Sequence, residues 1–344
     1  MKSTPAKEFQ QRNASADILK VLSIFSVVFI HGSSIVPVSS SNYDVSNTVI
    51  SLTTHVFRFC VPVFIFLWAY FTEKSVLKTG KDNSIKRISK LLIPFFFWSS
   101  VYFLYTANFK ELTLASIITK HWVGYGWSGQ YYFVILFQLI FLFGIIRKFS
   151  LSLIKYRSWI IVGSTIFYCL ISYSNWFDIG IIGKMSYRPF FYWLPYACLG
   201  IISAHKGIFN IEIPKRFIIF SPFLILAEIY LFNPSLANEY MLPSVFIASM
   251  LLASSIDSKL TYFELSPRLA QLIKTVANST LGIFCLNPIV ILLLSSIIHK
   301  TGIVLNGPGI SVITAIISTL VIISICIMLI NLLKKMKLGQ LVSN

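Results

Sequence analysis

Three ionisable side chains, Asp17, Lys20 and His31, lie in one strongly hydrophobic stretch near the start of the chain. At ~100° per residue, the eleven-residue separation of Lys20 and His31 puts both on one helix face, with His31 roughly 16 Å further along the axis. Ionisable groups are costly within a membrane and mark functional sites there. A cation near one membrane surface and an imidazole at depth indicate chemistry carried part-way across a bilayer.

Each of these residues also has an ordinary structural explanation. His31 can link two helices by a hydrogen bond. Asp17 can stabilise the first turn of a helix through the helix dipole. Lys20 can extend to the lipid head groups. The face that all three share favours the functional interpretation.

The composition indicates a membrane protein. Of 344 residues, 56% are hydrophobic and 12% are charged, which is far from the balance of a soluble domain. We predict an all-α polytopic membrane protein of one domain over residues 1–344, because apolar runs long enough to cross a bilayer recur along it. The ten predicted transmembrane helices are 17–37, 49–72, 88–107, 130–148, 157–174, 188–204, 217–232, 241–256, 276–298 and 309–333.

The net charge of +17 reflects topology rather than nucleic-acid binding. Most Lys and Arg residues fall in alternate segments between the predicted helices, so the positive-inside rule places both termini in the cytoplasm. The polar segment 1–16 and the tail 334–344 are then cytoplasmic, and the basic loops face anionic membrane lipids. We expect a multi-pass protein of the cell membrane, with no nucleic-acid partner.

A second group of cations, Lys86, Arg87 and Lys90, precedes the apolar run that starts at Leu91. Topology accounts for most of the basic residues in this loop. A helix start with cations at this spacing can also hold phosphates, Arg by its planar fork and Lys as a point charge. The 3′-phosphate and pyrophosphate of coenzyme A would suit it.

These motifs together resemble the integral-membrane acyltransferase-3 family. Asp17-Ile-Leu-Lys20, followed by His31, is similar to its first-helix signature, an Arg eleven residues before a His. Arg87-Ile-Ser-Lys90 is similar to an Arg-x-x-Arg element that leads to a Pro, here Pro94. Three further matches are Arg58-Phe-Cys-Val-Pro62, Gln130-Tyr-Tyr-Phe133 and Gly282-Ile-Phe284-Cys-Leu-Asn287. The resemblance runs from about residue 14 to residue 333.

The chain departs from the family pattern at several positions. Lys20 and Lys90 stand where the family usually has Arg, which keeps the charge and loses the bidentate geometry. Asn287 stands where His is frequent, and an Asn cannot act as a base near neutral pH. Trp68-Ala69-Tyr70 replaces the common Ser-Gly-Tyr. Because His31 is retained, the changes fit a divergent branch better than an inactive enzyme.

The resemblance implies an O-acyltransferase, above all an O-acetyltransferase. It would move an acyl group from cytoplasmic acyl-CoA, with acetyl-CoA as the donor, to a hydroxyl of an envelope glycan or lipid-linked sugar. His31 would be the general base, with a transient acyl-His as an alternative. Lys20, Arg87 and Lys90 would bind the donor phosphates, and Asp17 would position Lys20.

Four further residues are candidates for substrate binding: Arg58, Asn287, Glu228 and Tyr132. Arg58 and Glu228 are predicted in the outer half of the membrane, where structural pairing, with each other as candidate partners, is the favoured interpretation. Tyr132 ends an aromatic segment, 110–132, that could stack on sugars, although an interfacial aromatic belt is favoured there.

Two other classes of function stay open at this point. A transporter or exporter of a glycan, lipid-linked sugar or small metabolite would also use intramembrane charges and a histidine. A structural partner in a glycan-synthesis complex is a third interpretation. An enzyme of this kind could also need a separate extracytoplasmic transfer protein. We expect no metal, because no His, Cys or carboxylate cluster has metal-ligand spacing.

Overall fold

In the computed structural model, the described part of the chain consists mainly of helices joined by short turns. It comprises residues 13–35, 43–82, 84–106, 113–118, 126–173, 188–209, 213–232, 236–257, 262–301 and 307–342. These ranges contain α-helices and short 3₁₀ turns and no strand. The predicted all-α fold is therefore confirmed.

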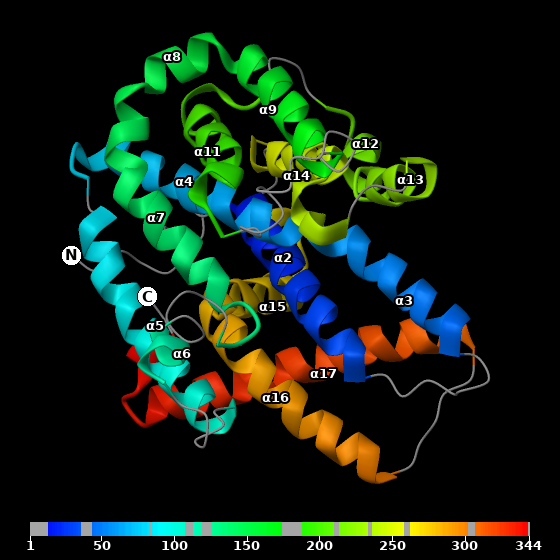
Figure 1. Cartoon of the computed structure of the whole chain (residues 1–344). Coiled ribbons are helices and arrows are strands. Elements are labelled where there is room, and N and C mark those ends of the chain that lie inside the picture. Colours follow the sequence, from blue (N-terminus) through cyan, green and yellow to red (C-terminus); the bar gives the residue numbers. More distant parts are fainter. Residues whose placement is uncertain are drawn as a thin grey trace.

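The α-helices follow one another as a bundle of long and short segments (Figure 1). In the first half they are α2 (Ala14–Gly32), α3 (Tyr43–Val56), α4 (Cys60–Thr79), α5 (Ser84–Thr106), α6 (Leu114–Ile117), α7 (Gln130–Lys148), α8 (Ser150–Lys155) and α9 (Arg157–Ser172). In the second half they are α11 (Leu194–Lys206), α12 (Lys215–Phe220), α13 (Phe223–Phe232), α14 (Pro243–Ser254), α15 (Pro267–Asn278), α16 (Thr280–Thr301) and α17 (Pro308–Lys335). The 3₁₀ turns are η1 (Ser33–Ile35), η3 (Phe57–Phe59), η7 (Phe190–Tyr192), η8 (Leu236–Met241), η9 (Ser255–Asp257), η10 (Tyr262–Glu264) and η11 (Gly339–Leu341).

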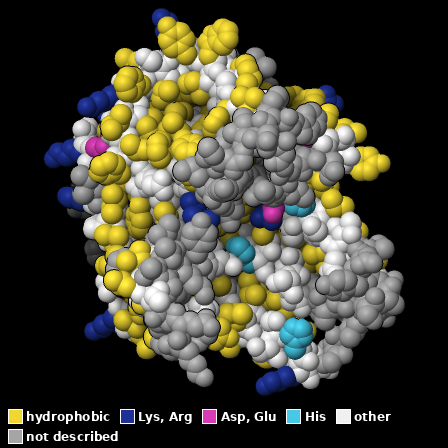
Figure 2. All heavy atoms as spheres, in the orientation of Figure 1, with side chains coloured by type: hydrophobic (Ala, Val, Ile, Leu, Met, Phe, Trp, Pro, Cys, Tyr) yellow, Lys and Arg dark blue, Asp and Glu magenta, His cyan; other side chains and the backbone are white. Residues whose placement is uncertain are grey.

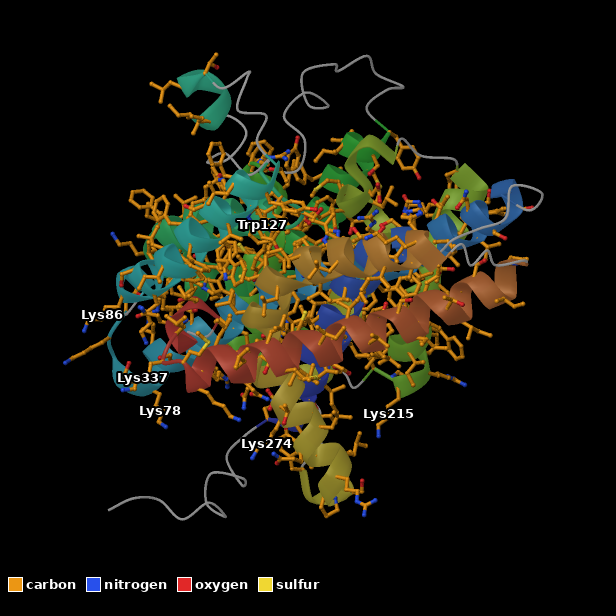
Figure 3. All side chains as sticks on the ribbon, turned by 90° about the horizontal axis from the view of Figure 1, so that it is seen from below. Lys78, Lys86, Trp127, Lys215, Lys274 and Lys337 are labelled. Carbon is orange, nitrogen blue, oxygen red and sulfur yellow. The ribbon has the colours of Figure 1, made fainter. Side chains whose placement is uncertain are left out.

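Six helical segments of the described chain are long and apolar enough to cross a membrane: Ala14–Ile35, Ser46–Thr79, Lys86–Thr106, Gln130–Lys148, Thr280–Thr301 and Pro308–Lys335. The other four predicted spans correspond to the shorter helices α9, α11, α12 with α13, and α14. The chain is thus a membrane protein, while ten crossings and cytoplasmic termini stay predictions. In Figure 3, the labelled Lys78, Lys86, Lys215, Lys274 and Lys337 lie along the lower and left edges, and Trp127 lies away from them.

The second predicted span, 49–72, is not one continuous helix. It is built from α3 and α4, which are separated by the 3₁₀ turn η3. Pro62 accounts for the break, because a proline has no N–H to bond the carbonyl of Arg58 and its ring crowds that carbonyl. The turn places Arg58 at the junction of the two helices.

Two predicted boundaries differ from the structure at the C-terminal end. The span 276–298 begins instead at Thr280, because residues up to Asn278 form the separate amphipathic helix α15, whose buried Ala270 and Ile273 pack on Ala14 of α2. The tail predicted from residue 334 starts two residues later, because α17 extends to Lys335. After α17 the chain turns back and buries Leu341 and Val342 in the main core.

Helix α2 lies inside the bundle and packs against α3, α4, α15, α16 and α17 (Figure 1). Helix α4 in turn packs closely along α11. The two helices approach closely at Gly200 of α11, where a Cβ atom would stand 2.5 Å from the carbonyl oxygen of Phe66. Small residues permit such contact between membrane helices. This packing fixes α2 and α4, which carry most of the candidate site.

Candidate active site

The first turn of α2 holds Asp17 and Lys20 together. Asn13 caps the helix, accepting a hydrogen bond from the backbone N–H of Ala16. The buried carboxylate of Asp17 lies 3.2 Å from the Lys20 ammonium through Oδ1, and its Oδ2 accepts a 2.6 Å hydrogen bond from the Tyr262 hydroxyl. This ion pair is the contact that the predicted positioning role of Asp17 requires.

Lys20 opens onto a cavity of about 490 Å³ between α2, α4, α5, α7 and α16. We call it the cationic cavity, because its polar lining includes three cations and the rest is mainly aromatic and aliphatic. Its lining consists of Lys20, Phe64, Leu67, Trp68, Phe71, Arg87, Lys90, Leu91, Tyr132, Leu136, Thr280, Leu281 and Phe284. The three cations predicted to bind the donor phosphates are thus brought together at one cavity.

The three cations of the cationic cavity are held differently. The Lys20 ammonium also lies 4.9 Å from the ring centroid of Phe71. Arg87 donates a hydrogen bond from Nη1 to the Thr72 hydroxyl. Lys90 is exposed and forms no ion pair within the described residues. Arg87 and Lys90 therefore keep donors that can meet a phosphate.

His31 lies at the other end of α2 and is half-buried. It does not line the cationic cavity, and by helix rise it stands roughly 16 Å along the axis from Lys20. The turn η3 packs beside it, with the ring of Phe57 4.7 Å from that of Phe29. This packing brings the charge of Arg58 within electrostatic range of the His31 imidazole.

The ionic partner of Arg58 is Glu239 of η8, so the expected pairing with Glu228 is wrong. Arg58 Nη2 forms an ion pair with Glu239 Oε2, and Nη1 lies 3.2 Å from the Tyr240 hydroxyl. Glu239 Oε2 is also 3.4 Å from His55 Nδ1. We call His55, Arg58, Glu239 and Tyr240 the Arg58 cluster. Figure 2 shows histidine, basic and acidic side chains gathered in a hollow on one face of the molecule.

Electrostatics within the Arg58 cluster favour an ionised Glu239. Burial opposes ionisation, but the positive charge of Arg58 and the contact with His55 hold the pKa of the Glu239 carboxyl below its ordinary value. Burial is the largest influence on Tyr240, where it raises the pKa of the phenol to about 12 despite the nearby Arg58. At neutral pH the cluster therefore contains a paired carboxylate and guanidinium.

Glu228 has a structural role that explains its position. Its Oε1 accepts a 2.9 Å hydrogen bond from the Tyr173 hydroxyl, and its Oε2 accepts one of 2.8 Å from the backbone N–H of Ser244. Ser244 is the second residue of α14, so the carboxylate satisfies a free N–H at the positive end of that helix. Both oxygens of the substrate-binding candidate Glu228 are thus engaged within the protein.

Asn287 directly precedes Pro288, which lies inside α16. Pro288 has no N–H for the carbonyl of Phe284, and Asn287 Nδ2 donates to that carbonyl at 2.8 Å and to Ile283 at 3.0 Å. The Tyr102 hydroxyl bridges the next gap, accepting from Ile289 N–H and donating to the Cys285 carbonyl. The Nδ2 group of Asn287 thus bonds backbone carbonyls of its own helix. A substrate contact through its buried Oδ1 stays a prediction.

The described part of the aromatic segment is core rather than an interfacial belt. Trp127 and Tyr131 are buried, and Trp127 stacks on Tyr102 with ring centroids 4.9 Å apart. Tyr132 lines the cationic cavity beside Phe284, at 5.3 Å between ring centroids. The belt prediction is therefore wrong for these three residues, whereas Trp122 and Tyr125 lie outside the described residues.

Sequence reasoning missed one buried ionic cluster. Glu73 of α4 is 1% exposed and accepts from Arg147 Nε at 3.0 Å, while its other oxygen lies 2.9 Å from His205 Nε2. These residues are far apart in the sequence and no local spacing joins them. The cluster connects α4, α7 and α11 and lies outside the cationic cavity.

The comparison with known families decides the class of this protein. The model of the acyltransferase-3 family, described as an acyltransferase domain, matches residues 13–329. The chain belongs to the acyltransferase-3 family. No curated protein matches it, and no solved structure matches it.

Membership of the acyltransferase-3 family makes the protein a membrane acyltransferase. The matched region contains both ends of the candidate site, the cationic cavity and the Arg58 cluster beside His31. Within the described residues, no group of three or more His, Cys, Asp and Glu side chains is placed to hold a metal ion. The individual roles of His31, Lys20, Arg87, Lys90 and Asp17 stay predictions.

Proposed function

We propose that this acyltransferase-3 protein is an O-acetyltransferase. In this proposal acetyl-CoA is the donor, on the cytoplasmic side, and the acceptor is a hydroxyl of an envelope glycan or lipid-linked sugar. The protein acts within the cell membrane.

The observation that carries the proposal is the cationic cavity. Coenzyme A combines a strongly anionic phosphate end with a long, mostly uncharged arm. Lys20, Arg87 and Lys90 supply positive charge at one cavity, and its aromatic and aliphatic remainder suits the arm. A membrane acyltransferase has use for such a site at the end of the bundle that carries the basic loops.

In the proposed mechanism, the phosphates bind these three cations and the acyl-bearing arm extends along α2 towards His31. The roughly 16 Å between Lys20 and His31 along the helix is within the reach of a pantetheine arm. The acceptor hydroxyl approaches from the outer side, where His31 takes its proton as the sugar oxygen attacks the thioester. Asp17 keeps the Lys20 ammonium at the phosphate end.

The test measures base-labile O-acetyl groups on the surface glycans of cells that express the protein. We expect ester with the wild type and none with His31→Ala, at matched amounts of protein in the membrane. His299→Ala is the matched control, because His299 is exposed in the last turn of α16. That variant should retain the ester.

Two results would contradict the proposal. Equal ester in the wild type and His31→Ala would remove His31 from the mechanism. Absence of ester in every strain, with glycan export dependent on the protein, would contradict acyl transfer to these glycans.

A further inference from the structure

The guanidinium of Arg58 is held on two of its edges. Glu239 pairs with Nη2, and the Tyr240 hydroxyl lies 3.2 Å from Nη1. The ring of Tyr240 also lies 5.1 Å from the central carbon of the guanidinium, in a cation–π contact. Two neighbouring residues of η8 therefore fix the plane of Arg58.

The third nitrogen of this guanidinium, Nε, carries an N–H that neither Glu239 nor Tyr240 binds. Arg58 Nε is buried and has no hydrogen-bond partner among the described residues. A buried donor without an acceptor is costly, and the cost is larger for a charged group. The position of this N–H therefore suits an oxygen that arrives with a substrate.

This free donor lies where the two parts of the proposed reaction meet. Arg58 lies in η3, which packs against α2, the helix that ends beside His31. Tyr131 packs towards the Arg58 cluster, with its ring 6.4 Å from that of Tyr240, whereas the next residue, Tyr132, lines the cationic cavity. Two consecutive residues of α7, Tyr131 and Tyr132, thus contact the Arg58 cluster and the cationic cavity respectively.

We propose that Arg58 is a catalytic residue that binds the negatively charged oxygen formed during acyl transfer, through its Nε–H. The proposal rests on the proposed function, because it assigns a role in that reaction. Glu239 and Tyr240 act as positioning residues that aim the donor. Fixed donors directed at developing charge are among the largest contributions to enzymatic rate.

The step is an addition followed by an elimination. The acceptor oxygen bonds to the thioester carbonyl carbon while His31 takes the hydroxyl proton, and the carbonyl electron pair moves onto oxygen. The Nε–H of Arg58 donates to that oxyanion. The electron pair then returns, the C–S bond breaks, and the coenzyme A thiolate takes the proton from His31. The products are the ester and coenzyme A.

The experiment uses membranes that contain the full-length protein and its native acceptors. Radiolabelled acetyl-CoA is the donor, and base-labile label in the glycan fraction gives the initial rate as acetyl-CoA is varied. Arg58→Lys keeps a positive charge for Glu239 but cannot hold two partners and present a third donor in one plane. We expect its kcat to fall about 100-fold with the KM for acetyl-CoA unchanged.

Arg147→Lys is the matched control, since Arg147 also pairs with a buried carboxylate, Glu73, outside the proposed site. It should retain the wild-type kcat. If Arg58→Lys does not reach the membrane, the doubly neutral variant Arg58→Gln with Glu239→Gln removes both charges and should show the same loss of kcat.

The outcomes separate this inference from the proposed function. A wild-type membrane that forms no ester overturns both. A wild type that forms ester while Arg58→Lys matches its kcat overturns only the role of Arg58. A rise in KM with kcat unchanged also overturns it, because that pattern indicates uniform substrate binding rather than binding of the oxyanion.

Discussion

Lys20 is the residue through which α2 reaches the cationic cavity. It stands where the acyltransferase-3 family usually has Arg, and it is held on one side by Asp17 and on the other by the ring of Phe71. An ammonium can offer a phosphate a point charge and up to three donors, whereas a guanidinium offers a planar fork. Binding of the donor phosphates should therefore depend more on the positive charge at this position than on the planar geometry of a guanidinium.

Substitution of Lys20 tests that expectation. Lys20→Ala should weaken binding of coenzyme A to the purified protein about tenfold to hundredfold, the value of one hydrogen bond to a charged group. Lys20→Arg should bind at least as well as the wild type. Lys78→Ala, which removes an exposed lysine outside the cavity, is the control. Calorimetric titration with coenzyme A measures all four, and equal affinity in Lys20→Ala would exclude this residue from the donor site.

At the residue scale, the sequence predicts contacts between near neighbours and misses those between distant residues. Asp17 and Lys20 are three apart on a helix, so their proximity follows from helix geometry alone. Arg58 and Glu239 come from segments far apart in the chain, and the expected position of Arg58 in the outer half of the membrane pointed to Glu228, which is not its partner. Only the packing of η8 against η3 selects the partner.

At the scale of helices, the contact between α4 and α11 depends on Gly200. A Cβ at this position would also stand 2.8 Å from the side chain of Ala69, besides its clash with the Phe66 carbonyl. Neither atom belongs to a flexible side-chain end, so the helices themselves would have to separate. Since α4 supplies four residues to the cationic cavity, this separation would reach the site.

Gly200→Ala should therefore destabilise the protein by about 1–3 kcal/mol, the usual cost of overpacking a close contact. Gly163→Ala is the control, because a Cβ at Gly163 of α9 meets nothing within 4 Å. That variant should be as stable as the wild type, or more so by up to about 1 kcal/mol, since Ala is a better helix former than Gly. Thermal unfolding in detergent compares the three, and an unchanged Tm for Gly200→Ala would contradict the close-contact argument.

Apolar runs in the sequence predict where the long helices lie. They do not predict where a helix is interrupted, because that depends on prolines and on the hydrogen-bond partners of the backbone. A hydropathy pattern predicts one span across residues 49–72, and the hydrogen-bond geometry of Pro62 divides it. Pro288 interrupts α16 in the same way, yet the helix continues there because Asn287 and Tyr102 bond the freed backbone groups. The partners of the backbone decide whether a proline ends or merely bends a membrane helix.

At the scale of the whole molecule, the last described residues pack behind two helices that line the cationic cavity. The turn η11 contacts α5 and α17, and the indole N–H of Trp98 on α5 donates to the Leu341 carbonyl at 2.9 Å. The Val342 carbonyl lies against α16 near Gly282. Helices α5 and α16 carry Arg87, Lys90 and Phe284 among the cavity-lining residues, so the C-terminal turn holds two of the cavity walls from behind.

This arrangement predicts that the C-terminal turn affects donor binding from a distance. Leu341→Asp buries an unpaired carboxylate against α5 and should lower both the Tm and the affinity for coenzyme A, although Leu341 does not line the cavity. Gln340→Asp adds the same charge at the neighbouring exposed position and should change neither. Thermal unfolding and calorimetric titration on the same preparations measure the pair. If Leu341→Asp lowers the Tm but leaves the affinity for coenzyme A unchanged, the prediction is wrong. Contacts among the long helices would then be enough to hold α5 and α16 in position at the cationic cavity.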